Sequence, residues 1–548
     1  MLFEHAYRGS SAISSTADQT RMSFAPDVTR EPTFFKGRLR RRIEFREAVS
    51  ALHDVVVSDL RFKPKDKTAY KEWAARQEQI DWQAVAAERT QVLGRVKELQ
   101  SELTALYARS SQRMGPFYKA RSEYFKYLYE KEKDFWFVLD PVITVHPDEV
   151  FFECFSQDES SYGRLGAGYE VFDDVGEFAC GTTNIDYSAS LYDEFQKIRT
   201  YKETRFEIDP SGFEVQTAGE EDYKEVKIDL PDSWVRGFLQ VSSAMSLPAR
   251  TFELHPMDVH NLCFVLRRRR EQKGPRAMRY HLTPGEPVRV VFEPWETEVV
   301  CPRSVYGGKD AEVIRVWGRR RLHILERLIP VARKFTAHLL GTGMPSFYVA
   351  DLGDMSFTLG LSGWTANDWS SAGNFDLLAP RAEVDDLTKR RVFEELRRGW
   401  SAKPSELASR LNLDRSVVLG ALGAYTQAGR AVFDLNKNVY RARELSREPL
   451  PLQQLRFANP REESAARFVE TRAVEQAGAE SNPEGQLTLS GVVREKEKQF
   501  RPSLTLDADG RMVRAECTCN WHQQHKLFKG PCEHILALRS EAARRRRL

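Results

Sequence analysis

The last part of the chain contains cysteine and histidine residues whose types and spacing are suited to metal binding. Cys517 and Cys519 are separated by one residue, and after twelve further residues Cys532 and His534 repeat that spacing. Three thiolates and one imidazole complete a tetrahedral shell of protein ligands, which is typical of a structural rather than a catalytic zinc site. The sequence therefore predicts one structural Zn²⁺ held by these four residues.

Short strands and a helix must bring these ligands together. The two-residue period of a strand places four side chains on one face, those of Val513, Ala515, Cys517 and Cys519. The apolar spacing of residues 535–538 fits a short helix that packs back onto the preceding hairpin. His522 and His525 lie in the loop between the two ligand pairs, and either could replace His534 as the fourth ligand.

The ligand order C-x-C, twelve residues, C-x-H resembles that of the SWIM zinc finger family. Members of that family share a ββα fold around the metal, so the resemblance implies this fold for residues 487–540. Residues 357–369, 429–435 and 440–444 are also similar to segments of large bacterial SWIM proteins. SWIM domains are associated with DNA binding and with protein–protein contacts, and the resemblance does not choose between these two functions.

Basic and aromatic side chains surround the predicted zinc site, where they could contact phosphates and stack on bases. The residues are Arg511, Arg514, Trp521, Lys526, Phe528, Lys529, Arg544, Arg545, Arg546 and Arg547. The whole chain has 82 Lys and Arg against 79 Asp and Glu, so any electrostatic preference must be local. The four arginines at the C-terminus are equally typical of a solvated tail.

The length of 548 residues exceeds what one hydrophobic core supports and predicts a multidomain α+β protein. A heptad repeat at Val85, Val92, Leu99 and Leu106 predicts a long amphipathic helix; an intramolecular hairpin is favoured over a dimeric coiled coil, and the oligomeric state stays open. Residues 321–340 are expected to be helical, with a break or kink at Pro330.

The expected parts are a flexible arm (1–35), a helical region (36–140), an α+β domain (141–380), a winged-helix-like domain (384–445), a helix and linker (446–486), the zinc finger (487–540) and a basic tail (541–548).

The winged-helix-like domain is indicated by the order helix, short helix, helix and hairpin. Pro404 occupies a first-turn position, and Asp414 is suited to cap the helix that runs towards Ala428. That helix would be the recognition helix of a DNA-binding protein, but few of its side chains could reach base edges. A protein-binding role fits this domain equally well.

Sequence signatures of common enzymes and of export are not found in the chain. Residues 307–309 lack the spacing of a phosphate-binding loop, and residues 360–363 miss a nucleophile elbow by one position. The N-terminus does not resemble a signal peptide, charges interrupt the apolar stretch 322–340, and the seven cysteines are an odd number. We therefore expect a cytoplasmic protein without a membrane segment or enzymatic activity, and no small-molecule substrate is indicated.

Three functions remain for this sequence. The first is recognition of nucleic acid, either DNA or RNA, through the zinc finger and the basic tail. The second is that of a protein–protein adaptor subunit in a larger, ATPase-driven assembly. The third is an enzyme whose site is assembled from distant residues of the middle α+β domain.

Overall fold

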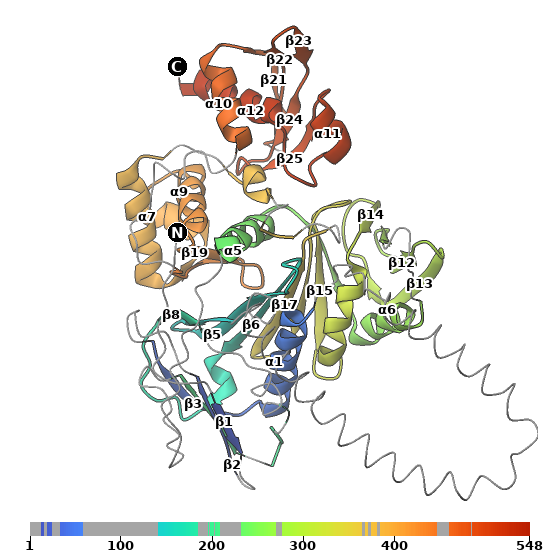
Figure 1. Cartoon of the computed structure of the whole chain (residues 1–548), viewed down its shortest axis with the longest axis vertical. Helices are drawn as coiled ribbons and strands as arrows, with labels where there is room; N and C mark the ends of the chain where they lie inside the picture. Colours follow the sequence, from blue (N-terminus) through green and yellow to red (C-terminus); the bar gives the residue numbers. More distant parts are fainter. Residues whose placement is uncertain are drawn as a thin grey trace, which may run out of the picture. The chain divides into compact units, whose positions relative to one another are not determined.

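The computed structural model describes residues 12–15, 19–24, 33–58, 141–184, 196, 198–201, 203–208, 232–269, 277–363, 368–370, 374–380, 384–445, 460–483 and 485–547 (Figure 1). It has a mixed α+β architecture with several antiparallel sheets. The heptad repeat from Val85 to Leu106 lies outside the described residues, so the predicted long helix stays a prediction.

An eight-stranded antiparallel sheet occupies the middle of the sequence, in the order β10-β15-β16-β17-β6-β5-β4-β8. Its strands are β4 (Val142–Val145), β5 (Glu149–Phe155), β6 (Ser161–Gly168), β8 (Gly181–Asn184), β10 (Arg250–Leu254), β15 (Lys334–Leu339), β16 (Ser346–Asp351) and β17 (Met355–Leu361). Every residue of β5 and β17 is buried. These central strands are therefore covered on both faces.

Two helices cover opposite faces of this sheet (Figure 1). On one face, Phe45 of α1 (Arg42–Val56) lies edge-on to Phe152, with 6.3 Å between ring centroids. On the other face, Phe155 meets Trp234 of α5 (Asp232–Met245) at 5.2 Å. Successive side chains of a strand point to opposite faces, so the apolar run of β5 supplies both layers of the core.

Two smaller sheets and two short 3₁₀-helices accompany the central sheet. The five-stranded sheet has the order β1-β2-β9-β3-β7, and the four-stranded sheet has the order β13-β12-β11-β14. Their strands are β1 (Ala12–Ser15), β2 (Gln19–Phe24), β3 (Phe35–Leu39), β7 (Phe172–Asp173), β9 (Glu203–Ile208), β11 (Met278–Leu282), β12 (Pro287–Phe292), β13 (Thr297–Val305) and β14 (Glu312–Val316). The 3₁₀-helices are η2 (Tyr169–Val171) and η4 (Phe375–Leu378).

The structure differs from the expected arm at residues 1–35, because β1 and β2 lie there. Strand β2 pairs in parallel with β9, and β3 at the start of the predicted helical region pairs with the other side of β9. Their partner comes from a distant part of the sequence, so local periodicity does not reveal the pairing.

The helix expected over residues 321–340 is wrong in its second half. A 3₁₀-helix, η3 (Arg319–Leu328), precedes Pro330, and the chain then forms strand β15. Phe335, Ala337 and Leu339 are fully buried in that strand. This two-residue alternation is the strand signal that outweighs the helical appearance of the segment.

Residues 384–445 contain elements in the predicted order, with a short extra strand. They are α7 (Asp386–Gly399), β18 (Ser401–Ala402), α8 (Pro404–Leu411), α9 (Arg415–Gln427), β19 (Ala431–Asp434) and β20 (Val439–Ala442). Pro404 begins α8. Asp414 occupies the N-cap position of α9, but its side chain makes no capping hydrogen bond. Phe393 of α7 stacks on Tyr425 of α9 with 4.1 Å between centroids. The β19–β20 hairpin is called the wing below.

Residues 460–547, called the C-terminal module below, contain two longer helices and a sheet of order β21-β22-β24-β25, with β23 on β22. The elements are α10 (Pro460–Glu470), β21 (Val474–Ser481), β22 (Leu487–Glu495), β23 (Lys498–Phe500), β24 (Ser503–Leu506), β25 (Met512–Glu516), α11 (Asn520–His525) and α12 (Glu533–Arg547).

Two predicted boundaries of this module are corrected. The first half of the expected linker at 477–486 belongs to strand β21, which pairs with β22. In the turn between them, Asn482 Oδ1 accepts the backbone N–H of Gln486 at 2.8 Å. The polar, Gly- and Pro-containing composition belongs to this turn and not to a linker. The expected basic tail is helical, since α12 continues to Arg547.

One further helix, α6 (Pro256–Arg268), packs against η3. Its N-cap residue His255 accepts the backbone N–H of Met257 through Nδ1 at 3.1 Å.

Candidate metal centre

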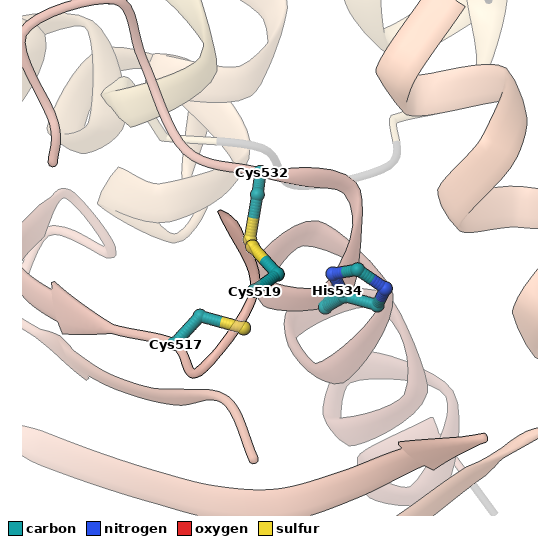
Figure 2. Close-up of side chains that lie close together, drawn as sticks. All are labelled: Cys517, Cys519, Cys532 and His534. Atoms are coloured by element: carbon teal, nitrogen blue, oxygen red, sulfur yellow. The ribbon is translucent and has the colours of Figure 1, made fainter. Parts of the chain in front are cut away.

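Three cysteines and one histidine of the C-terminal module form a buried cluster. Cys517 follows β25, Cys519 is the N-cap residue of α11, Cys532 precedes α12, and His534 lies in its first turn. One potential ligand atom from each residue lies within 4.8 Å of the others. Figure 2 shows the three thiols and the imidazole grouped beside the start of α12. This set could hold one metal ion with four protein ligands.

The strand alternation predicted for these ligands does not extend through the whole segment. Val513 is 37% exposed, whereas Ala515 and Cys517 are buried. The register between β24 and β25 shifts between Thr505 and Leu506, which places an extra residue in β25. Cys519 reaches the cluster because the chain turns into α11 after the strand ends, and not because it continues the strand.

Local hydrogen bonds prepare Cys519 for metal binding. Hydrogen bonds from the thiols of Cys517 and Cys532 lower the pKa of Cys519 below its usual range. Its sulfur also accepts the backbone N–H of His522 at 3.4 Å. The thiolate is the form that binds metals, so this lowered pKa favours the ligand form of Cys519.

His534 has the surroundings of a ligand and not of an ordinary core histidine. It is 2% exposed, and neither ring nitrogen has a hydrogen-bond partner. Buried polar groups are nearly always paired, and a bound ion would satisfy one nitrogen. Its ring stacks on Phe468 at 5.6 Å and lies 4.1 Å from the ring of Phe500. Glu495 Oε2, 3.6 Å from Nε2, is placed to orient the ring.

The two histidines considered as alternative ligands lie outside the cluster. Among the described residues, the group contains His534 and neither His522 nor His525. His522 is buried in α11, and His525 lies against Trp521 with 4.4 Å between ring centroids. Burial lowers the pKa of both side chains, which favours their neutral forms.

Several side chains predicted to contact nucleic acid are held by neighbouring carboxylates. Arg511 Nε lies 2.7 Å from Asp507 Oδ2, and its Nη1 donates to Ser246 O at 3.0 Å. Arg544 and Arg545 both pair with the buried carboxylate of Glu541 at 2.9 Å. Arg511 is therefore engaged within the chain, whereas Arg544 and Arg545 keep 52% and 47% of their side chains exposed.

The predicted aromatic contacts are also used internally. The guanidinium of Arg461 lies 3.9 Å from the ring centroid of Trp521. Phe528 packs so closely on Gly343 that a Cβ added at that glycine would lie 2.7 Å from the ring. Lys529 contributes its carbonyl to hydrogen bonds from Arg461 and Asn374, at 2.9 and 3.2 Å.

The remaining predicted contact residues are Arg514, Lys526, Arg546 and Arg547. Arg514 and Lys526 are exposed. Arg546 and Arg547 lie at the end of α12.

The C-terminal module is joined to the rest of the chain by polar contacts. Arg539 of α12 is 9% exposed. It donates to the carbonyls of Leu377, Ala379 and Gly510 at 2.8–3.0 Å. Arg415 at the start of α9 pairs with Asp509 at 2.8 Å. The positive charges of this region therefore bind the module to its neighbours.

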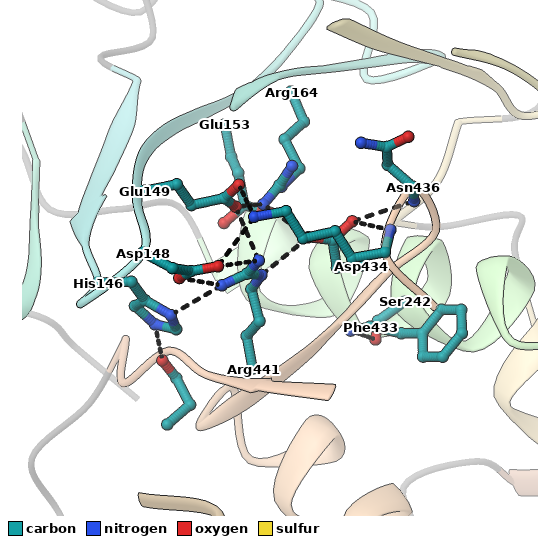
Figure 3. A network of polar contacts seen from close by, with 12 residues as sticks. His146, Asp148, Glu149, Glu153, Arg164, Ser242, Phe433, Asp434, Asn436 and Arg441 are labelled. Carbon is teal, nitrogen blue, oxygen red and sulfur yellow. Dashed lines mark hydrogen bonds and ion pairs between the residues drawn. The ribbon is translucent and has the colours of Figure 1, made fainter. Parts of the chain in front are cut away.

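A second polar network, which the sequence did not indicate as a unit, attaches the wing to the central sheet (Figure 3). Arg441 of β20 pairs with Asp148 and with Asp434, both at 2.8 Å. Arg443 pairs with Glu153 of β5 at 3.1 Å. Both arginines are almost completely buried. The charged positions within the apolar run of β5 are a sequence signal for such buried pairs, but not for their partners.

The network continues through Arg164 and His146. Arg164 contacts Glu149 and lies 3.2 Å from Asp434. His146 Nε2 donates to Ala442 O at 2.6 Å, and its Nδ1 lies 3.2 Å from Arg441 Nη1. Burial, together with the charge of Arg441, lowers the pKa of His146 to about 4. The imidazole is therefore neutral in the folded protein at neutral pH.

Comparisons with known proteins do not identify this chain. It matches no protein-family model, and no curated protein matches its sequence. Among solved structures, Proliferating Cellular Nuclear Antigen from Entamoeba histolytica aligns with a TM-score of 0.32 and 8% identity, covering 60% of this chain and 98% of that one. A likeness this low supports no inference. Within the part that the structure describes, no helix is long and apolar enough to cross a bilayer.

Proposed function

We propose that this chain is a non-enzymatic zinc protein that acts as a protein–protein adaptor. In this proposal a SWIM-type finger, residues 487–540, stabilises one end of a scaffold that also contains a winged helix, residues 384–445. The observation that carries the proposal is the burial of Arg441, Arg443 and Arg539 in contacts within the chain.

The composition of the cluster supports zinc as the metal. Three thiolates and one imidazole are soft to intermediate ligands that favour Zn²⁺ over hard cations such as Mg²⁺. Four protein ligands complete a tetrahedral shell, so no position is left for a reactive water. The ion would therefore contribute to folding of the C-terminal module.

Contact of the wing with phosphates would be costly. Arg441 and Arg443 are buried in ion pairs. Removing one member of a buried pair typically costs about 3–5 kcal/mol, because the other charge stays buried without a partner. Arg415, the basic residue at the start of the candidate recognition helix, pairs with Asp509 but stays 52% exposed. The buried pairs of Arg441 and Arg443 favour a protein partner over DNA or RNA.

Exposed apolar side chains give a protein partner a surface to bind. Met257 and Phe264 of α6 are 46% and 45% exposed, and Val300 and Val305 of β13 are 48% and 54% exposed. Strand β13 is an edge strand of its sheet, and such strands present unpaired backbone groups. Contiguous apolar patches are typical of interaction sites, and α6 and β13 are neighbours in the fold.

The adaptor proposal is tested by affinity capture from the native cells with the full chain and a Phe264→Glu variant. We expect the variant to lose a specific partner, whereas Leu387→Glu, a control 70% exposed on α7, retains it. In parallel, fluorescence anisotropy measures binding of duplex DNA, single-stranded DNA and RNA as a function of salt. Salt-sensitive binding that is lost in an Arg514→Ala, Lys526→Ala variant would instead establish nucleic-acid recognition.

The metal is tested separately by elemental analysis of the full chain and a Cys517→Ser, Cys519→Ser variant. We expect the variant to contain one zinc fewer per chain. Hydrogen exchange should then become faster in β22 to α12, while the central sheet remains protected. An unchanged zinc content would contradict the assignment.

A further inference from the structure

A second group of potential metal ligands lies where α6 packs against η3. Cys263 comes from α6, and His323 and Glu326 come from η3. One potential ligand atom from each lies within 4.8 Å of the other two. Cys263 is far in the sequence from the other two, and the C-terminal cluster contributes none of the three.

The spacing of the three groups approaches that of ligands on one ion. His323 Nδ1 lies 3.0 Å from Glu326 Oε1. With bonds of about 2.0–2.1 Å, neighbouring ligand atoms of a tetrahedral zinc site lie about 3.3 Å apart. The thiol of Cys263 faces the same turn, because its sulfur lies 3.6 Å from the carbonyl oxygen of Leu322, the residue before His323.

Burial differs across the group in a way that leaves one side accessible. Cys263 is completely buried, whereas the side chains of His323 and Glu326 are 33% and 25% exposed. An ion at this place would be held from the core by sulfur and would face solvent on the side of the imidazole and carboxylate. Arg267 Nε, 3.4 Å from Glu326 Oε1, is placed to orient the carboxylate.

We propose that Cys263, His323 and Glu326 form a second metal site, which binds one Zn²⁺ through three protein ligands and keeps one coordination position open. Binding converts the Cys263 thiol to a thiolate and releases its proton to solvent. Three protein ligands with a fourth position for water or another small ligand distinguish this site from the closed set in the C-terminal module. The site does not depend on the adaptor function proposed above.

The test is the zinc content of the full chain after incubation with excess Zn²⁺ and removal of unbound metal. We expect two zinc ions per wild-type chain and one in Cys263→Ser. Cys154→Ser is a matched control, because Cys154 is equally buried and its sulfur lies 3.7 Å from Leu52 O. This control should retain two ions. Should Cys263→Ser fail to fold, His323→Ala changes a partly exposed ligand and should also contain one.

A cobalt experiment separates the two sites. In the Cys517→Ser, Cys519→Ser variant, added Co²⁺ should produce a thiolate-to-cobalt charge-transfer band that is absent when Cys263→Ser is added. A single zinc in the wild-type chain, or two in both Cys263→Ser and His323→Ala, would overturn the proposal. The three side chains would then form only a hydrogen-bonded cluster.

Discussion

Lowering the pH should destabilise the fold through His146. Burial and the neighbouring Arg441 lower the pKa of His146 from 6.5 to about 4. Below pH 6.5 the unfolded chain binds a proton at this position while the folded chain does not. The stability contributed by the neutral imidazole is therefore present above pH 6.5 and is lost as the pH falls towards 4.

The size of the effect follows from this difference in pKa. One pKa unit corresponds to about 1.4 kcal/mol, so the full shift is worth about 3 kcal/mol in the free energy of unfolding. Between about pH 7 and about pH 5 the loss should be about 2 kcal/mol. Although burial opposes it, hydrogen bonding to Arg441 holds the pKa of Asp148 below its usual range, so this carboxylate titrates at lower pH.

The assay is urea unfolding of the full chain over this pH range, compared with a His146→Gln variant. Glutamine cannot take up a proton but retains an amide N–H that can donate to Ala442 O. Burial also lowers the pKa of His338 to about 4, so this histidine also contributes to the pH dependence of the wild-type free energy of unfolding. Between about pH 7 and about pH 5, we expect the loss in free energy of unfolding to be about 2 kcal/mol smaller in His146→Gln than in the wild type. In His338→Gln, the part of the loss that comes from His146 should remain. Parallel profiles for wild type and His146→Gln would refute the reasoning.

Two further changes test the contacts that hold the wing and the C-terminal module. Arg443→Met should lower the free energy of unfolding by about 3–5 kcal/mol, because Glu153 would remain buried without its arginine; adding Glu153→Gln should recover part of the loss, and a loss below about 1 kcal/mol would contradict a buried ion pair. Gly530→Ala should make hydrogen exchange in the C-terminal module faster than Gly510→Ala does. Both glycines have φ of +78°, but only at Gly530 would the new Cβ meet another residue, Asn374 O, at 2.7 Å. Equal exchange in the two variants would show that this contact does not hold the module.

The candidate metal ligands were accessible from sequence because their chemistry and spacing are local. Cys517, Cys519, Cys532 and His534 lie close together in the chain, and few other roles use three cysteines and a histidine at such intervals. The structure brings these four together, although it places Cys519 by a turn and a helix N-cap and not by strand alternation. The order of helices and strands in residues 384–445 was accessible for a similar reason, since caps and turns are short-range signals.

Other features could not be predicted because they depend on partners distant in the chain. Strand β2 pairs with β9, and Cys263 meets His323 only when α6 packs on η3. The polar composition of residues 482–486 indicates a break in the chain, but the break is a hairpin turn because β21 and β22 pair on either side of it. Composition alone does not distinguish a turn from a linker.

From the sequence alone one can identify a four-ligand metal-binding set, an α+β composition and a group of basic residues near the C-terminus. Whether those basic residues face solvent was decided by the tertiary structure. Arg539, Arg511 and Arg441 of the wing have the same charge in the sequence as any exposed arginine, yet each is paired with a carbonyl or carboxylate from a distant part of the chain. Burial requires such partners, because an unpaired charge in the interior is too costly to retain. Local spacing therefore predicts which ligands and contacts a segment could provide, whereas packing determines which of its charges are exposed to a partner.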